Sequence, residues 1–193
     1  PDERFLGFAK NHSLDTIISN ASALSPRLKR LTVERFGGDL LHETYGSTEA
    51  GIVTNMRPDL LMVKPESVGG AFLGVEIQIR DENGSLCEAG EIGELFARGP
   101  YNFLGYLNRP QETSETVIDG WVTVQDLALQ DADGAIHIMG RSKDMIVSGG
   151  INVYPAEVES VIATVPGVLE VAIVGLADDE WGEVLHAFVV PGS

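Results

Sequence analysis

The sequence is poor in cysteine and in long apolar runs. Its single cysteine, Cys87, rules out a disulfide within the chain, and such sparing use of cysteine fits a reducing, cytoplasmic setting. No run of about 18 uncharged apolar residues occurs, so we expect no membrane-spanning helix. The first ten residues also lack the basic-then-apolar pattern of a signal peptide.

Basic residues are also scarce, with 13 Lys and Arg against 29 Asp and Glu and a net charge of −16. A nucleic-acid-binding protein carries a basic surface, so we expect no nucleic acid among the partners. Apolar residues make up 44% of the chain, which is enough for a packed core. The histidines show no spacing typical of metal ligands, and no Cys–His pair suggests a catalytic nucleophile. They are His12, His42, His137 and His186.

The pattern of residues 1–59 predicts an α/β unit. The apolar run at 14–21 is typical of a buried strand that leads into a loop. A helix is expected over 25–38, with Ser25 as N-cap and Pro26 at its first position. Leu28 and Leu31 mark one side of this helix, and two glycines end it.

Residues 60–142 predict a small antiparallel β-barrel or sandwich, because several short strands alternate with turns. "DENG" and "DADG" are typical turn sequences that join strand pairs. The expected strands are 75–80, 93–99, 121–130 and 135–140.

Residues 143–193 predict a small, incomplete α+β unit. A helix is expected over 155–165, and its apolar residues share one face: Val158, Val161, Ile162 and Val165. Strands are expected at 168–176 and 183–190. The fold class is therefore α/β, then a β-barrel, then α+β.

The strongest indication of a functional site is "HETYGSTEAG" at 42–51, where a short strand is expected to lead into a loop. An aromatic ring, two hydroxyls and a carboxylate stand in a row, and a turn alone requires none of them except glycine. Four further stretches are unusual in the same way: "NFLGYLNRPQET" (102–113), "DGWVTVQDLA" (119–128), "GRSKDMIVSGGINVYPAEVE" (140–159) and "DDEWGEVLHAFVV" (178–190).

In this order and spacing the five stretches resemble the adenylate-forming ligases, which include acyl- and aryl-CoA synthetases, luciferases and the adenylation domains of peptide synthetases. The resemblance runs from about residue 14 to the end. It implies the C-terminal part of a large domain followed by part of a mobile small domain. Family enzymes use ATP and Mg²⁺ to convert a carboxylic acid to an acyl-adenylate, and then pass the acyl group to a thiol.

The resemblance also implies an acceptor, because "KDMIVSGGINVYPAEVE" is closer to the sequences of the CoA synthetases than to those of peptide-synthetase domains. Coenzyme A is therefore the expected thiol. Transfer to the phosphopantetheine of a carrier protein is a second interpretation, and a catalytically dead binding module of the same fold is a third. The acid and the oligomeric state stay open.

By this resemblance, the nucleotide is held by the residues of two stretches. Tyr45 lies beside the adenine, as a flat ring that offers stacking area, and Gly46 belongs to the same site. Thr48 contacts the phosphates, and Glu49 is the carboxylate associated with Mg²⁺. Asp126 accepts hydrogen bonds from the ribose hydroxyls, and Arg141 lies near the ribose and phosphate.

The resemblance assigns the remaining residues to the hinge, the thiol and the acid. Lys143 is at the hinge about which the small domain rotates. Gly150 borders the pantetheine channel, and Trp181 either lies near the pantetheine or is a core residue. Asn20 and Ala21 are at the acyl pocket, where the family has smaller residues; Asn20 either shapes the pocket or holds a turn.

Two departures from the family pattern bear on these roles. Thr123–Asp126 reads Thr-Val-Gln-Asp, where the family usually has Arg/Lys-Thr-Gly-Asp, so the geometry of this loop is open. The family's phosphate loop with its lysine and the catalytic lysine of the small domain have no counterpart in the 193 residues. We therefore expect this chain to be an internal fragment that by itself adenylates poorly or not at all.

Overall fold

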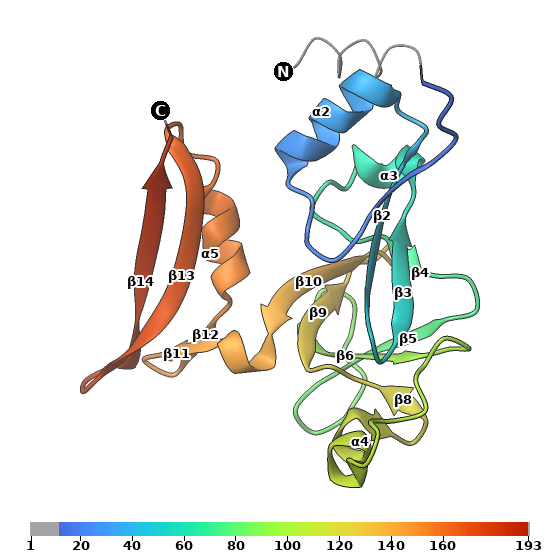
Figure 1. Cartoon of the computed structure of the whole chain (residues 1–193). Coiled ribbons are helices and arrows are strands. Elements are labelled where there is room, and N and C mark those ends of the chain that lie inside the picture. Colours follow the sequence, from blue (N-terminus) through green and yellow to red (C-terminus); the bar gives the residue numbers. More distant parts are fainter. Residues whose placement is uncertain (1–11, 193) are drawn as a thin grey trace.

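A computed structural model describes residues 12–192 of the chain. Three β-sheets follow one another along the sequence, and helices pack beside each of them (Figure 1). None of the described helices has the length and hydrophobicity needed to cross a membrane. The α/β, antiparallel and α+β succession predicted from the sequence is confirmed at this level.

The first sheet has the strand order β1-β2-β3-β4, in which β1 runs parallel to β2 and the other pairs are antiparallel. Its strands are β1 (Ile17–Ser19), β2 (Leu41–Ser47), β3 (Gly51–Met56) and β4 (Gly70–Ala71), with helices α2 (Pro26–Phe36) and α3 (Pro58–Leu61). The predicted start of α2 is confirmed, because the Ser25 hydroxyl accepts a hydrogen bond from the Leu28 amide. Strand β3 was not predicted.

Helix α2 buries a lysine rather than the two leucines that the sequence pattern emphasised. Leu28 and Leu31 are exposed, whereas Lys29 is only 2% exposed. The Lys29 Nζ lies 2.5 Å from a carboxylate oxygen of Glu43 on β2 and donates to the Pro65 carbonyl oxygen at 2.5 Å. The lysine is therefore compensated by one charge and one backbone acceptor.

The second sheet is antiparallel, with the order β10-β9-β6-β8-β7 and β5 paired to β6. The predicted strand 121–130 is in fact two strands, separated by residues 123–125, because the backbone of Gln125 turns to a φ of +63° there. The elements are β5 (Glu76–Arg80), β6 (Gly93–Arg98), α4 (Pro110–Thr116), β7 (Val117–Ile118), β8 (Trp121–Val122), β9 (Asp126–Gln130) and β10 (Ile136–Arg141).

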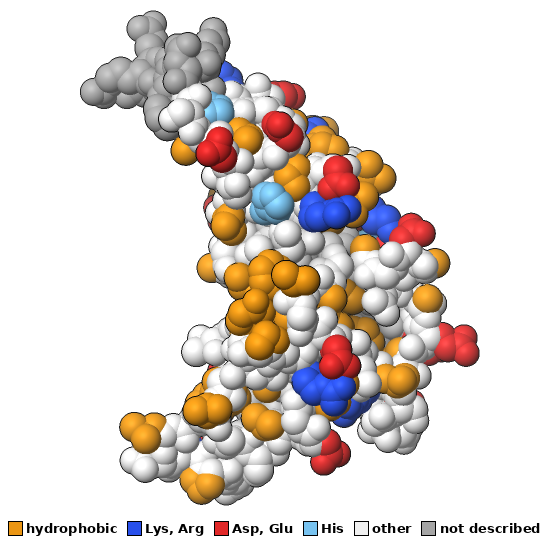
Figure 2. Space-filling view, turned by 90° about the vertical axis from the view of Figure 1, so that its right-hand side faces the viewer, with side chains coloured by type: hydrophobic (Ala, Val, Ile, Leu, Met, Phe, Trp, Pro, Cys, Tyr) orange, Lys and Arg blue, Asp and Glu red, His pale blue; other side chains and the backbone are white. Residues whose placement is uncertain are grey.

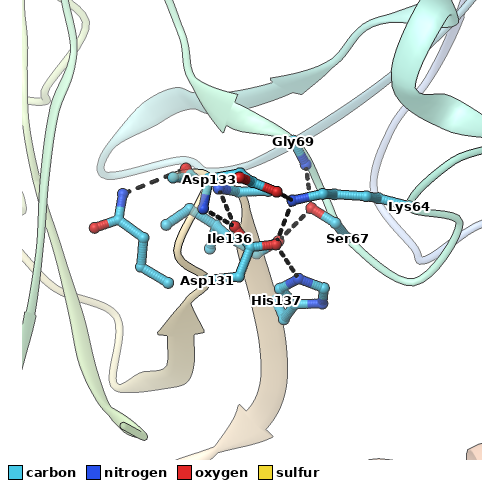
Figure 3. Close-up of polar contacts among 10 residues, drawn as sticks. Lys64, Ser67, Gly69, Asp131, Asp133, Ile136 and His137 are labelled. Atoms are coloured by element: carbon cyan, nitrogen blue, oxygen red, sulfur yellow. Dashed lines mark hydrogen bonds and ion pairs between the residues drawn. The ribbon is translucent and has the colours of Figure 1, made fainter. Parts of the chain in front are cut away.

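The first and second sheets share one hydrophobic core, which includes Val53 of β3, Leu95 of β6 and Ile136 of β10. A polar cluster fastens the segment after α3 to the β9–β10 hairpin (Figure 3). In this cluster the Lys64 Nζ donates to the carboxylates of Asp131 at 2.6 Å and Asp133 at 2.8 Å.

The separation of residues 1–59 from residues 60–142 as two domains stays a prediction.

Asp131 also holds the predicted turn at 131–134. One carboxylate oxygen accepts from the amides of Asp133 and Ala135, both at 3.0 Å, while the other faces Lys64 and His137 (Figure 3). The hydrogen bond from Lys64 holds the pKa of Asp131 well below its ordinary value. This carboxylate therefore stays ionised while it joins the two sheets.

The third sheet has the order β12-β11-β14-β13 and follows a single 3₁₀ turn, η1 (Ser142–Asp144). Its helix is shorter than predicted and ends at Ile162, and both Val161 and Val165 are exposed, so the predicted apolar face is only partly buried. The elements are β11 (Ile146–Ser148), β12 (Ile151–Val153), α5 (Pro155–Ile162), β13 (Val168–Asp178) and β14 (Gly182–Pro191).

The surface mixes charges of both signs. On the face shown in Figure 2, basic side chains lie beside acidic ones in the part that the structure describes. The described residues form ion pairs that include Arg57–Asp59, at 3.1 Å, and Arg98–Glu76, at 2.8 Å. The few basic residues of this acidic chain are thus partly neutralised by their neighbours.

Candidate active site

The "YGSTE" segment forms the tip of the β2–β3 hairpin. The predicted short strand continues as β2 through Ser47, and β3 begins at Gly51. A side chain at Gly46 is excluded because its Cβ would lie 1.9 Å from the Gly51 carbonyl oxygen. The glycine therefore lets the two strands approach closely while Thr48 and Glu49 project from the turn between them.

Asp126 stands at the start of β9, directly after the loop that departs from the family pattern. The buried Thr123 hydroxyl donates to the Glu94 carboxylate at 2.5 Å and accepts from the Gln125 amide at 3.0 Å. The positive φ of Gln125 occupies a conformation that glycine adopts more easily. The loop is thus held by Thr123 and Glu94, without the family's glycine.

Tyr45, Asp126 and Arg141 meet although they are far apart in the sequence. The Tyr45 hydroxyl donates to Asp126 Oδ2 at 2.6 Å, and Arg141 Nε lies 3.5 Å from Asp126 Oδ1. Burial, and then the negative charge of Asp126, raise the pKa of the Tyr45 phenol well above its ordinary value. Tyr45 therefore stays protonated and fixes the carboxylate, whose side chain is 14% exposed.

Asp126 and Arg141 border a pocket of about 820 Å³, whereas Tyr45, which was predicted to lie beside the adenine, packs against the core and is not among the lining residues. Five of the residues predicted for the nucleotide and the reaction line it: Gly46, Thr48, Glu49, Asp126 and Arg141. Further lining residues were not predicted: Ser47, Tyr106, Arg109, Glu112, Glu115, Thr116, Thr123, Val124 and Gln125. Four carboxylates thus face two guanidinium groups, so the lining contributed by the described residues has an excess of negative charge.

Glu49 is held by a neighbour that the sequence analysis gave no role. The Tyr106 hydroxyl donates to Glu49 Oε1 at 2.6 Å. Partial burial favours a raised pKa of Glu49, but hydrogen bonds, chiefly the one from Tyr106, outweigh it and lower the pKa. Tyr106 lies within one of the five stretches, yet no pattern links it to a residue 57 positions earlier.

Glu49 alone does not make a metal site. Within residues 12–192 no three His, Cys, Asp or Glu side chains are arranged to hold a metal ion. Mg²⁺ commonly needs only one or two protein carboxylates when phosphates and water supply its other ligands. The ionised Glu49 therefore fits a Mg²⁺ ion that arrives with a nucleotide.

Lys143 lies outside this pocket, in the turn η1 between the second and third sheets. It lines a different cavity of about 430 Å³, together with Arg141 and residues of α5, β13 and β14. Arg141 therefore borders both cavities, and Lys143 is two residues further along the chain.

Gly150 and Trp181 lie in two turns of the third sheet, away from the lining of the first pocket, and Gly149, the neighbour of Gly150, contacts Trp181. The Gly149 amide donates to the Trp181 carbonyl oxygen at 2.8 Å, and a Cβ at Gly149 would lie 2.6 Å from the Trp181 ring. The Trp181 side chain is 54% exposed and is absent from the buried core residues of the described chain. Gly150 has a φ of +81° and open space beside it.

Asn20 and Ala21 lie in the exposed loop after β1 and do not line the pocket formed by the described residues. The Asn20 side-chain oxygen accepts from the Ala21 amide, and Ala21 has a φ of +77°. Because β1 is parallel to β2, with Ser19 opposite Glu43, this loop leaves the sheet at the same end as Tyr45. The loop therefore lies at the same end of the strands as the tip of the β2–β3 hairpin.

Comparison with known families matches most of the chain. A family model described as AMP-binding enzyme matches residues 3–107, and one described as AMP-binding enzyme C-terminal domain matches residues 157–193. A medium/long-chain fatty-acid–CoA ligase of Mycobacterium tuberculosis is 41% identical over 180 residues, which are 92% of this chain and 31% of the relative. The chain thus spans about a third of the length of the curated relatives it matches.

Solved structures share the fold. The o-succinylbenzoate-CoA synthetase of Bacillus subtilis, in complex with an acyl-adenylate intermediate, has a TM-score of 0.85 and 32% identity over 95% of this chain and 37% of its own. An amide bond synthetase from Marinactinospora thermotolerans has a TM-score of 0.88 and 29% identity over 99% of this chain and 41% of its own.

Proposed function

Because this chain belongs to the family of AMP-binding enzymes, we propose that its full protein activates a carboxylic acid with ATP and then forms a thioester with coenzyme A. Several relatives are named as CoA ligases for fatty, indoleacetic or succinylbenzoic acids. Solved neighbours contain ATP, AMP or an acyl-adenylate. These names support an AMP-forming acid–thiol ligase and leave the acid open.

The observation that carries the proposal is the joint position of Asp126, Tyr45 and Arg141 beside Thr48 and Glu49. In the proposal the Asp126 carboxylate accepts hydrogen bonds from the two ribose hydroxyls, as a charge-assisted pair. Tyr45 and Arg141 fix that carboxylate through the 2.6 Å and 3.5 Å contacts. A carboxylate fixed beforehand loses less conformational entropy when the ligand binds.

The phosphates are assigned to the hairpin tip and the arginines. Thr48 donates a hydroxyl hydrogen bond to a phosphate oxygen, and Glu49 ligates the Mg²⁺ that accompanies the nucleotide. Bound there, Mg²⁺ neutralises the negative charge that develops on the phosphates during the reaction. Because the pocket itself holds more carboxylates than guanidinium groups, we infer that efficient adenylation needs further cationic groups from the full protein.

The thioester step is assigned to the third sheet. Gly150 and Trp181 border the pantetheine arm, and Lys143 is the hinge that brings them toward the adenylate. Asn20 and Ala21 contribute to the acyl pocket. The open space beside Gly150 and the exposure of the Trp181 ring support this assignment, since both surfaces are accessible to a narrow ligand.

The test uses the full-length protein and a panel of carboxylic acids. We expect acid-dependent exchange between pyrophosphate and ATP, and AMP release that requires coenzyme A. Exchange without coenzyme A-dependent release would favour transfer to a carrier protein. Nucleotide binding without exchange for any acid would favour a catalytically dead module.

The ribose assignment is tested by Asp126→Ala in the same protein. We expect AMP binding to weaken by about 1.5–3 kcal/mol, the scale of a hydrogen bond to a charged group. Asp39→Ala is the matched control, because Asp39 is an exposed carboxylate outside the pocket. An unchanged AMP affinity for Asp126→Ala, measured by calorimetry, would exclude the ribose role.

A further inference from the structure

The loop between β6 and α4 is attached to the tip of the β2–β3 hairpin through Glu49. The Phe103 amide donates to the Glu49 carbonyl oxygen at 2.7 Å, and the Tyr106 hydroxyl donates to the Glu49 carboxylate at 2.6 Å. The same residue is therefore held by the loop at its backbone and at its side chain.

Further contacts keep Tyr106 itself in place. Its ring meets the Phe103 ring edge-on, with centroids 4.9 Å apart. The Tyr106 amide donates to the Thr113 hydroxyl of α4 at 2.9 Å. Gly51 lets the loop approach, because a Cβ there would lie 2.6 Å from the Tyr101 Cβ. The position of the Tyr106 hydroxyl is thus set by packing that does not depend on Glu49.

We propose that Tyr106 is a positioning residue that holds the Glu49 carboxylate in the orientation in which it ligates the metal of a metal–nucleotide complex. The inference rests on the proposed function and adds a residue to it. Tyr106 contacts Glu49 and touches neither reacting atom nor metal in this scheme.

The physical basis is the number of acceptor sites on a carboxylate. An ionised carboxylate has about four lone-pair sites, so one hydrogen bond from Tyr106 leaves capacity for a cation. A free glutamate side chain loses rotamer freedom when it binds a metal, and a hydrogen bond formed beforehand reduces that loss. Partners of this kind, which orient a metal ligand, typically change metal affinity by about 10–100-fold when removed.

A purely structural role for Tyr106 makes a different prediction. Tyr106 also lines a second cavity beside α4 and packs on Phe103, so its ring contributes to the fold. Tyr106→Phe keeps the ring and its edge contact and removes only the hydroxyl. If the hydroxyl serves the fold alone, this variant lowers stability and leaves the metal affinity of the folded protein unchanged.

The experiment measures Mn²⁺ binding to the full-length protein by electron paramagnetic resonance, with a non-hydrolysable ATP analogue present. Mn²⁺ prefers the same oxygen ligands as Mg²⁺. We expect Tyr106→Phe to weaken Mn²⁺ binding by about tenfold, while the affinity for the analogue without metal changes less than twofold. Tyr101→Phe is the matched control, since its hydroxyl has no hydrogen-bond partner among the described residues.

A double variant makes the test sharper. In a Glu49→Gln background, the further change Tyr106→Phe is expected to have no additional effect on Mn²⁺ binding. Unchanged Mn²⁺ affinity in Tyr106→Phe, or effects of the two changes that simply add, would overturn the positioning role alone. If the parent protein fails to bind the analogue with metal, the proposed function and the positioning role both fall.

Discussion

Lys29 and Glu43 form a buried ion pair between helix α2 and strand β2. Their side chains are 3% and 4% exposed, and their charged atoms lie 2.5 Å apart. Glu43 also accepts a hydrogen bond from the Leu24 amide at 2.8 Å. The pair therefore links α2, β2 and the loop that carries Asn20 and Ala21.

Lys29→Met should destabilise the protein strongly, because it leaves the Glu43 charge buried without its partner. We expect a loss of about 3–5 kcal/mol in the free energy of unfolding, the usual cost of breaking a buried pair from one side. Urea unfolding of the full-length protein measures it. Arg30→Met, on the exposed side of the same helix, is the control and should change stability by less than about 0.5 kcal/mol.

The double variant Lys29→Met with Glu43→Gln should recover part of this loss, because no uncompensated charge remains buried. A Lys29→Met protein that is as stable as the parent would contradict the importance of the pair.

Asp131 gives the stability of the protein a dependence on pH. Its pKa is lowered in the folded state by Lys64, so its contribution is present above the unfolded-state pKa of about 3.9 and is lost as the pH falls toward the folded-state value. Asp131→Asn should therefore reduce the free energy of unfolding at pH 6 by about 1.5–3 kcal/mol. The deficit relative to the parent should shrink below about pH 4.

Asp133→Asn is the control for this prediction, because Asp133 bonds the same Lys64 but its side chain is 81% exposed. A smaller loss is expected, since exposed ion pairs contribute little. A deficit for Asp131→Asn that is equally large at pH 3 and pH 6 would show that the turn, and not the charge, is what the variant loses.

The residues that the sequence did not identify are those that no short motif marks. Tyr45, Glu49 and Asp126 were singled out because short motifs surround them. Lys29 and Tyr106 were given no role, because nothing local marks a lysine as buried or a tyrosine as bonded to a carboxylate 57 residues away. Only the packing of α2 on β2, and of the β6–α4 loop on the hairpin, brings these partners together.

At the scale of elements, local sequence signals predicted the start of a helix better than a break within a predicted strand. The Ser-Pro start of α2 was predicted because capping depends on neighbouring residues alone. The break at 123–125 was missed, because Thr-Val-Gln continues the alternation of polar and apolar residues that is typical of a strand. There the side chain of Thr123 turns inward to Glu94, and this tertiary hydrogen bond outweighs the local preference for a strand.

Gln125→Gly should stabilise this loop. Gln125 has a φ of +63°, which costs a non-glycine residue about 1–2 kcal/mol, whereas the added freedom of glycine in the unfolded chain costs about 0.5–1 kcal/mol. The free energy of unfolding should therefore rise by about 0.5–1 kcal/mol. The Gln125 carbonyl oxygen should keep its 2.8 Å hydrogen bond from the Ser142 amide, since the backbone conformation is unchanged.

Gln130→Gly is the matched control, because Gln130 is an exposed residue at the end of β9, the strand that follows this loop. It should lower stability, as glycine does in a strand. Thermal unfolding of the full-length variants measures both changes in stability. A Gln125→Gly protein less stable than its parent would show that the positive φ carries no strain.

At the scale of the whole molecule, the three sheets are not joined equally. The first two share a core and the Lys64 cluster. The third follows the short turn η1, and its helix α5 packs near β10 (Figure 1). The sequence predicted three successive units from changes in pattern, but sharing of a core depends on contacts that no single segment encodes.

Lys143→Pro tests whether the turn η1 is the hinge of the proposed ligase. Proline locks φ near −65°, so a chain that must rotate at this residue loses the required freedom. We expect the second half-reaction, thioester formation, to slow at least about tenfold more than adenylate formation, because only one of the two conformations remains accessible. Single-turnover kinetics of the full-length protein separates the two steps.

Lys143→Ala, which keeps the backbone free, is the control and should leave the ratio of the two half-reaction rates near that of the parent. Equal slowing of both half-reactions by proline would indicate that the third sheet moves about another point or does not need to move.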